Sequence, residues 1–101
     1  MLPNNIKNLA IHLLDETKHN NLKWSYDSYK SNISASYGDM HITLTYYFDY
    51  ESEVGSYIFD LYMHGKPYTF KENMFGSDFS LLATLYEQGM ASELGDFNFI
   101  K

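Results

Sequence analysis

The chain has 101 residues, the size of a single domain, and 45% of them are hydrophobic and 18% aromatic. That apolar content is sufficient for a packed core and argues against an intrinsically disordered chain. The net charge is −6 with histidine neutral, all seven basic residues are Lys, and Cys is absent. Binding to a nucleic-acid backbone is therefore disfavoured, and a disulfide framework, a thiolate metal site and a cysteine nucleophile are excluded.

The first predicted element is a helix over residues 4–18. Its apolar side chains recur with a period of 3.6 and form one stripe, Ile6, Leu9, Ala10, Leu13, Leu14 and Thr17. Pro3 stands just before this stretch, and Asn4 or Asn5 is expected to cap the first turn. The helical pattern ends at residues 19–21.

From residue 22 onward the period changes to two, which predicts strands over 22–27, 33–37, 40–50, 57–63 and 68–71. The third strand has the clearest alternation, with Phe48 and Tyr50 on its inward face and Tyr47 on the opposite face. Turn residues separate the strands, among them Gly38 and the stretch 64–67. The strands are therefore expected to form consecutive hairpins.

A second helix is predicted to follow Ser77 or Asp78, either of which can act as its N-cap, and Gly89 is expected to loosen its end. The order of helix, four or five strands and helix indicates a single α+β domain over residues 1–101. Its architecture is an antiparallel meander with the N-terminal and C-terminal helices packed on one face. For residues 92–101, docking on the sheet and docking on a partner both stay open.

Motifs that carry chemistry are not found in this sequence. His41, His64 and Asp60 are conceivable as a metal-binding set, but no two histidines have a short ligand spacing, so surface histidines and no metal are expected. The serines lack a Gly-x-Ser-x-Gly motif and the glycines lack a phosphate-binding pattern. We therefore expect a protein that is not an enzyme and has no cofactor.

The surplus of aromatic residues favours a binding surface. Tyr47 and Tyr62 are predicted on the outer sheet face, with Ile58 and Asp60 beside Tyr62. Tyrosine is common in interface cores, although outward tyrosines also occur simply because they suit strands. The predicted contact residues are Tyr47, Ile58, Asp60 and Tyr62, and the acidic residues Asp49, Glu51 and Glu53 are expected either to steer a basic partner or merely to aid solubility.

Three stretches together resemble a loose group of short, uncharacterised bacterial and phage proteins. These stretches are Leu13-Leu14-Asp15-Glu16-Thr17, Leu22-Lys23-Trp24 and Leu81-Leu82-Ala83-Thr84-Leu85-Tyr86-Glu87, with tyrosine-rich hairpins between the last two. The resemblance implies a helix, hairpins and a second helix, and because the group has no assigned activity it implies no functional residue.

The sequence therefore predicts a small acidic interaction protein that binds and blocks another macromolecule, as phage anti-defence inhibitors and immunity proteins do. The expected partner is a protein with a basic surface, and a homodimer is open. The alternative is a protein that binds a nucleotide or signalling molecule, with Lys23, Lys66 and Lys71 facing its phosphates. The start of the chain lacks signal-peptide features and no apolar run approaches about 20 residues, which predicts a cytoplasmic protein without a membrane segment.

Overall fold

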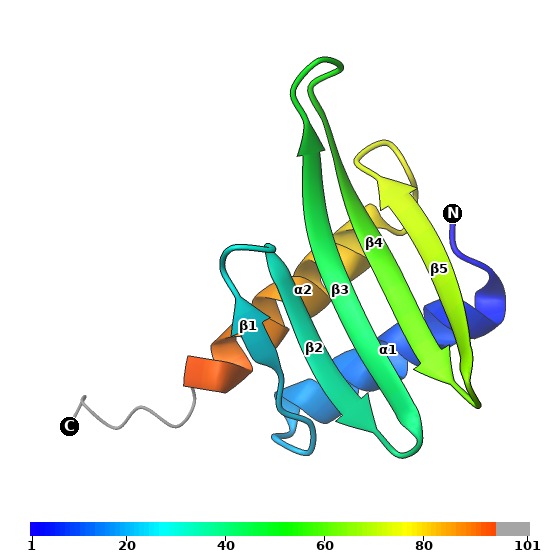
Figure 1. Cartoon of the computed structure of the whole chain (residues 1–101), viewed down its shortest axis with the longest axis vertical. Helices are drawn as coiled ribbons and strands as arrows, with labels where there is room; N and C mark the ends of the chain where they lie inside the picture. The colour runs from blue at the N-terminus through cyan, green and yellow to red at the C-terminus, as the bar shows by residue number, and fades with distance from the viewer. Residues whose placement is uncertain (95–101) are drawn as a thin grey trace.

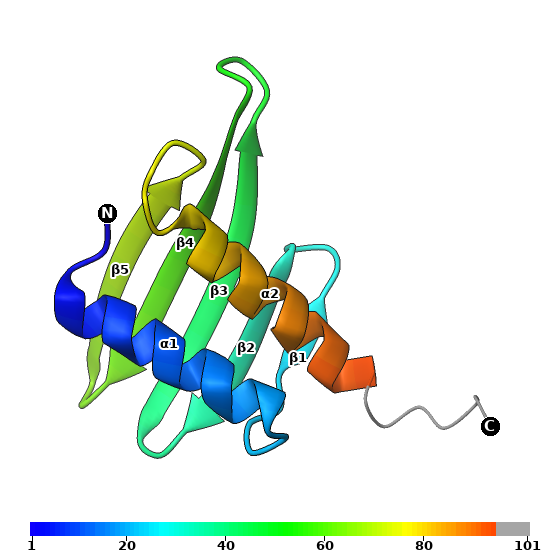
Figure 2. The ribbon, with the colours of Figure 1, turned by 180° about the vertical axis from the view of Figure 1, so that it is seen from behind.

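The computed structural model describes residues 1–94 and consists of one sheet and two helices (Figure 1). The sheet follows the chain, β1 to β5, and every neighbouring pair is antiparallel. The elements are α1 (Asn4–Lys18), β1 (Ser25–Asp27), β2 (Asn32–Tyr37), β3 (Met40–Asp49), β4 (Val54–Met63), β5 (Lys66–Asn73) and α2 (Phe79–Leu94). The predicted α+β meander is confirmed, and both helices lie on the same face of the sheet (Figure 2). Of the stretch 92–101, residues 92–94 extend α2 and the rest lies outside the described residues.

Tight turns set the register of the hairpins. His64 and Gly65 both have positive φ, 54° and 74°, and join β4 to β5 as a two-residue turn of the kind that matches the twist of the strands. Gly38, with φ of 60°, begins the corresponding turn between β2 and β3. The β5 strand is longer than predicted and includes Pro67, which an edge strand tolerates.

The core lies between the sheet and the two helices. Its fully buried side chains come from both layers: Leu13 from α1, Leu82 and Leu85 from α2, and Ile33, Ile42, Leu44, Phe59 and Leu61 from the strands. Trp24, just before β1, is also buried, and its Nε1 donates a hydrogen bond of 2.9 Å to Thr17 Oγ1. This bond ties the end of α1 to the start of the sheet.

Two aromatic residues predicted on the inward face of the third strand lie outside this core. Phe48 is only half-buried and Tyr50 is 85% exposed. They lie at the end of the β3–β4 hairpin, which projects beyond the helices (Figure 1). Strand alternation continues along the hairpin, but neither helix of the described residues covers its end, so the inward direction there does not lead to burial.

The helix ends also differ from the prediction. Pro3 occupies the N-cap position of α1 and no side chain within residues 1–94 caps the helix, so the predicted cap by Asn4 or Asn5 is wrong. Lys7 N instead donates a hydrogen bond of 2.8 Å to the Pro3 carbonyl. Gly89 lies within α2 and not at its end, so it does not loosen the helix terminus as predicted. Its lack of a side chain has another reason: Ile33 and Trp24 pack so closely against it that a side chain would collide with them.

Candidate binding face

The sheet face opposite the helices carries the side chains that the sequence placed outward. Figure 1 views the molecule from this side, and no helix of the described chain crosses it. Its centre consists of residue pairs across β3 and β4: His41 with Tyr62, Thr43 with Asp60, Thr45 with Ile58 and Tyr47 with Ser56. Ser56 is buried, so the exposed strip has the mixed side chains of His41, Thr43, Thr45, Ile58 and Asp60, with a tyrosine at each end.

The two tyrosines are the large exposed groups of this strip. Tyr47 is 51% exposed and Tyr62 is 53% exposed. The row of Tyr47, at Ser56 of β4, and the row of Tyr62 are six positions apart along that strand, which corresponds to roughly 20 Å. Lys71 Nζ lies 6.0 Å from the centre of the Tyr47 ring, so a positive charge accompanies this end of the strip.

Ile58 and Asp60 lie between the tyrosines and are both half-buried. The Thr69 hydroxyl donates a hydrogen bond of 2.6 Å to Asp60 Oδ1. One carboxylate oxygen is therefore engaged within the sheet, which holds the side chain in place and leaves the other oxygen for a partner.

The predicted acidic residues gather at the β3–β4 hairpin. Asp49 is the last residue of β3, and its Oδ1 accepts a hydrogen bond of 3.1 Å from Glu51 N. Glu51 and Glu53 are exposed in the turn that follows, where Glu53 has φ of 58°. This negative charge lies on the projecting tip beyond Tyr47, and not among the tyrosines.

Two hollows adjoin the strip beside the loop that joins β1 to β2. One, of about 350 Å³, has a polar lining from β1, β2 and β3 that includes His41 and Lys30. The other, of about 460 Å³, is lined by residues of β3 from both faces of the sheet and again by Lys30; its aromatic residues are Tyr46, Tyr47, Phe48 and Tyr50. The sequence offered no signal for Lys30, because its position depends on how the β1–β2 loop lies beside β3.

The histidines do not form a metal centre with the residues proposed for it. His41 lies on the outer face with Nδ1 3.5 Å from Ser36 Oγ, whereas His64 lies in the β4–β5 turn. Within residues 1–94, no three His, Asp or Glu side chains come together in an arrangement that would hold a metal ion.

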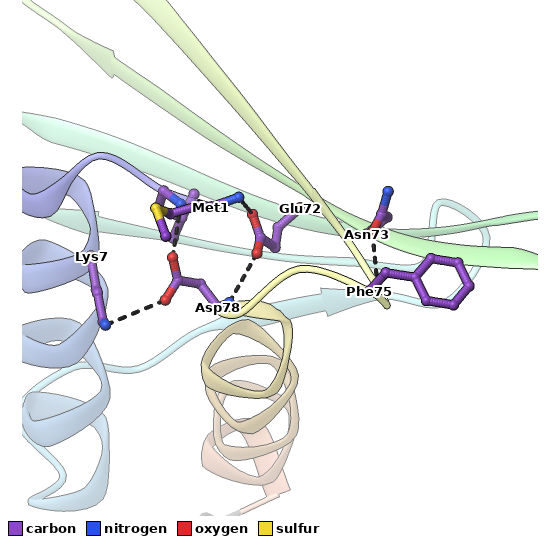
Figure 3. A network of polar contacts seen from close by, with 7 residues as sticks. Met1, Lys7, Glu72, Asn73, Phe75 and Asp78 are labelled. Atoms are coloured by element: carbon purple, nitrogen blue, oxygen red, sulfur yellow. Dashed lines mark hydrogen bonds and ion pairs between the residues drawn. The ribbon is translucent and has the colours of Figure 1, made fainter.

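A buried pair of carboxylates on the helix side was not predicted (Figure 3). Glu72 of β5 is 1% exposed and forms an ion pair with the amino group of Met1, and its Oε2 accepts a hydrogen bond of 2.9 Å from Asp78 N. Asp78 precedes α2 as predicted, but its carboxylate accepts a hydrogen bond of 2.8 Å from Leu2 N. The predicted strand ended at residue 71, whereas β5 continues to Asn73 and so includes Glu72.

These carboxylates have a structural role, because groups of the chain itself satisfy them. The Leu2 N–H, and more weakly Lys7 at 3.5 Å, lower the pKa of Asp78 despite the opposing effect of burial. The pair thereby holds the N-terminal segment against β5 and the start of α2.

Comparison with known proteins yields no match to a family model, to a curated protein or to a solved structure. Neither helix of the described chain is long and apolar enough to cross a membrane.

Proposed function

We propose that this chain is a small, acidic, non-enzymatic protein of the cytoplasm that binds and blocks another macromolecule through the outer face of its sheet. The observation that carries the proposal is the pair of half-exposed tyrosines, Tyr47 and Tyr62, at the two ends of the strip on the outer face. Tyrosine buries a large ring at low entropic cost and keeps a hydroxyl group for a hydrogen bond, which suits the centre of an interface.

The proposed partner is a protein with a basic surface. Glu51 and Glu53 project on the hairpin tip next to Tyr47, where they can attract positive charge before contact. Asp49, at the base of the tip, adds to this charge. Ile58 and Asp60 would lie at the centre of the contact. Small size, a net charge of −6 and the resemblance to short phage and bacterial proteins make anti-defence inhibitors and immunity proteins the classes we propose.

Removing both tyrosine side chains tests the proposal. Tagged wild-type protein and the variant Tyr47→Ala/Tyr62→Ala are used to capture partners from a lysate of the organism that encodes the chain. The captured protein is then purified, and its affinity for both forms is measured by calorimetry. We expect the double substitution to weaken binding by about 2–4 kcal/mol, since such side chains dominate interfaces.

Tyr29→Ala is the matched control, because Tyr29 is 99% exposed in the β1–β2 loop. This variant also loses an exposed tyrosine and is expected to bind like the wild type. Equal affinity of the double variant and the wild type would refute the outer face as the binding surface. Circular dichroism of all three proteins verifies that the fold is unchanged.

A second candidate function is the binding of a small planar anion such as a nucleotide or signalling molecule, alone or as a dimer. The observation that favours it is the hollow of about 460 Å³, since Lys30 and aromatic residues of β3 line it. Lys66, Lys71 and Lys23 were the lysines expected to serve such a ligand, but none of them lines this hollow.

A thermal-shift screen against nucleotides tests this alternative. A midpoint that rises with ligand concentration in the wild type but not in Lys30→Ala would support it, because only binding to the folded state raises the midpoint. No shift with any compound would leave the protein-binding proposal as the explanation of the exposed tyrosines.

A further inference from the structure

We infer that the open edge of β5 pairs with β5 of a second copy of this chain, antiparallel and about a two-fold axis at Phe70. The inference concerns the edge of the sheet and does not depend on the function proposed for its outer face. It rests on three observations: which edge is open, which main-chain groups point outward from it, and how these groups complement a second copy of themselves.

The two edges of the sheet differ in how their main chain is satisfied. Along the β1 edge, side chains of α2 accept the free N–H groups: Trp24 N donates to Ser92 Oγ and Tyr26 N to Glu93 Oε1, each over 3.1 Å. The other edge is β5, with eight residues, and its ladder partner is β4. An edge strand of this length presents unpaired groups on which another strand can add.

A single hydrogen bond determines which groups of β5 point outward. Met74 N donates to the Gly55 carbonyl over 2.9 Å, so position 74 faces the β4 side. Since antiparallel ladders alternate, positions 66, 68, 70 and 72 also face β4, whereas 67, 69, 71 and 73 point away. The Asn73 carbonyl agrees, because it accepts a hydrogen bond of 2.9 Å from Gly76 N. Among the described residues, no hydrogen bond reaches the outward main chain of Thr69 or Lys71.

With Phe70 on the two-fold axis, these outward groups match. Thr69 pairs with Lys71 of the second copy and Asn73 pairs with Pro67 of the second copy. Pro67 has no N–H, and in this register it lies opposite the Asn73 carbonyl, whose acceptor Gly76 already uses. The position where Pro67 lacks an N–H therefore faces the Asn73 carbonyl, which already accepts a hydrogen bond from Gly76 N.

Neighbouring registers are worse by the same criteria. An axis at Thr69 would place Pro67 opposite Lys71 of the second copy, whose carbonyl would then lack a donor. An axis at Lys71 would place the two lysines opposite each other, which is repulsive. In the Phe70 register Lys71 instead lies beside Thr69 of the second copy. The hydroxyl group of that Thr69 donates to Asp60, so the ammonium group of Lys71 approaches the carboxylate of Asp60 in the second copy.

The helix side of the edge also suits this register. Tyr68 is an exposed aromatic residue on that side, and it would lie opposite Glu72 of the second copy. Glu72 is covered there by the amino end of Met1, whose own side chain is exposed. Pairing would therefore bring Tyr68 and Met1, both exposed in the single chain, against each other.

Such a pairing would create a continuous ten-stranded sheet with all helices on one side. Both outer faces would then point in the same direction, which presents the strip between Tyr47 and Tyr62 twice. An interface built on one strand pair belongs to the small, transient class, so we expect a monomer–dimer equilibrium with a dissociation constant on the order of 10–100 μM.

Disulfide trapping tests both the dimer and its register, and the chain has no native Cys to interfere. The variants are Thr69→Cys and Lys71→Cys, both at exposed positions. Each is oxidised in a glutathione buffer alone, and the two are oxidised together as an equal mixture. Residues directly opposite in a hydrogen-bonded pair have Cα atoms about 5.5 Å apart, within disulfide range, whereas diagonal residues at about 7–8 Å exceed it.

In the mixture we expect the heterodisulfide between the two variants to exceed either homodisulfide by roughly fivefold or more. Sedimentation velocity of the wild type, followed over increasing concentration, is expected to show a shift from monomer to dimer. Three outcomes would overturn the inference. Either variant alone could form its homodisulfide as fast as the mixture forms the heterodisulfide, or the mixture could give the heterodisulfide at only about twice each homodisulfide, which is the ratio of random pairing. A wild type that stays monomeric at about 500 μM would overturn it as well.

Discussion

The substitution Thr17→Val removes one hydroxyl group, which forms two hydrogen bonds in the structure. Thr17 Oγ1 donates to the Leu13 carbonyl over 2.7 Å and accepts from Trp24 Nε1 over 2.9 Å, and both Thr17 and Trp24 are buried. Valine has nearly the same shape, so the substitution opens no cavity. It leaves the indole N–H of Trp24 without its partner in a contact where both side chains are almost fully buried.

The expected cost is that of a buried, unsatisfied donor, about 1–3 kcal/mol of unfolding free energy. The Leu13 carbonyl adds little to this, because it can keep its hydrogen bond within α1. For a domain of about 100 residues, a loss of about 2 kcal/mol lowers the melting temperature by about 10 °C. Urea unfolding followed by tryptophan fluorescence measures the loss directly, since Trp24 is the only tryptophan of the chain.

Thr84→Val is the control for this prediction. Thr84 Oγ1 makes the same kind of bond to its own helix, to the Ser80 carbonyl over 2.9 Å, but is only half-buried. Water can replace what it loses, so we expect a change within about 0.5 kcal/mol. If the two substitutions destabilise the protein equally, the bond between Thr17 and Trp24 does not stabilise the fold as we argue.

Three further predictions follow from other buried groups. Gly89→Ala is expected to destabilise the protein by about 1–2 kcal/mol in urea unfolding, because the added methyl group would collide with the buried Ile33 side chain. Alanine is the better helix former, so a stabilised variant would contradict this explanation. The lowered pKa of Asp78 means that its stabilising effect is present above the ordinary carboxyl range and is lost as the pH falls through its folded-state pKa. In Asp78→Asn the free energy of unfolding should therefore fall less steeply as the pH is lowered into the acid range. An unchanged dependence on pH would contradict the stabilising role of the Asp78 carboxylate. Burial raises the pKa of Tyr57 and of Tyr86 to about 12. Because the unfolded chain ionises first, stability should fall between pH 10 and 12, and an ultraviolet titration of the folded protein should show these two phenols ionising last; all tyrosines titrating together near pH 10 would refute this.

The sequence was sufficient for the arrangement of elements and for the two sides of the sheet. Alternation along β3 and β4 places Tyr47 and Tyr62 on one side and Phe59 on the other, because successive side chains of a strand point to opposite faces. Gly38 and Gly65 mark the tight turns, so the hairpins were predictable as well. Each of these properties depends on residues that are close together in the chain.

What the alternation could not predict is which inward side chains become buried. Phe48 and Tyr50 follow the inward pattern, but the helices end before the hairpin does, so neither joins the core. Glu72 breaks the apolar pattern, and only the folded chain brings the Met1 amino group and the Asp78 N–H to its carboxylate. The placement of Lys30 beside the aromatic hollow likewise depends on two segments distant in sequence.

Periodicity and turn residues by themselves therefore determined the α+β class, the meander and the outward direction of the tyrosines, since these are consequences of local backbone geometry. Tertiary structure decided where the helices stop covering the sheet, which donors satisfy the buried carboxylates, and which strand edge is left unpaired within residues 1–94. Each of these is set by contacts between segments far apart in the chain, and a pattern that repeats every two or 3.6 residues contains no information about them.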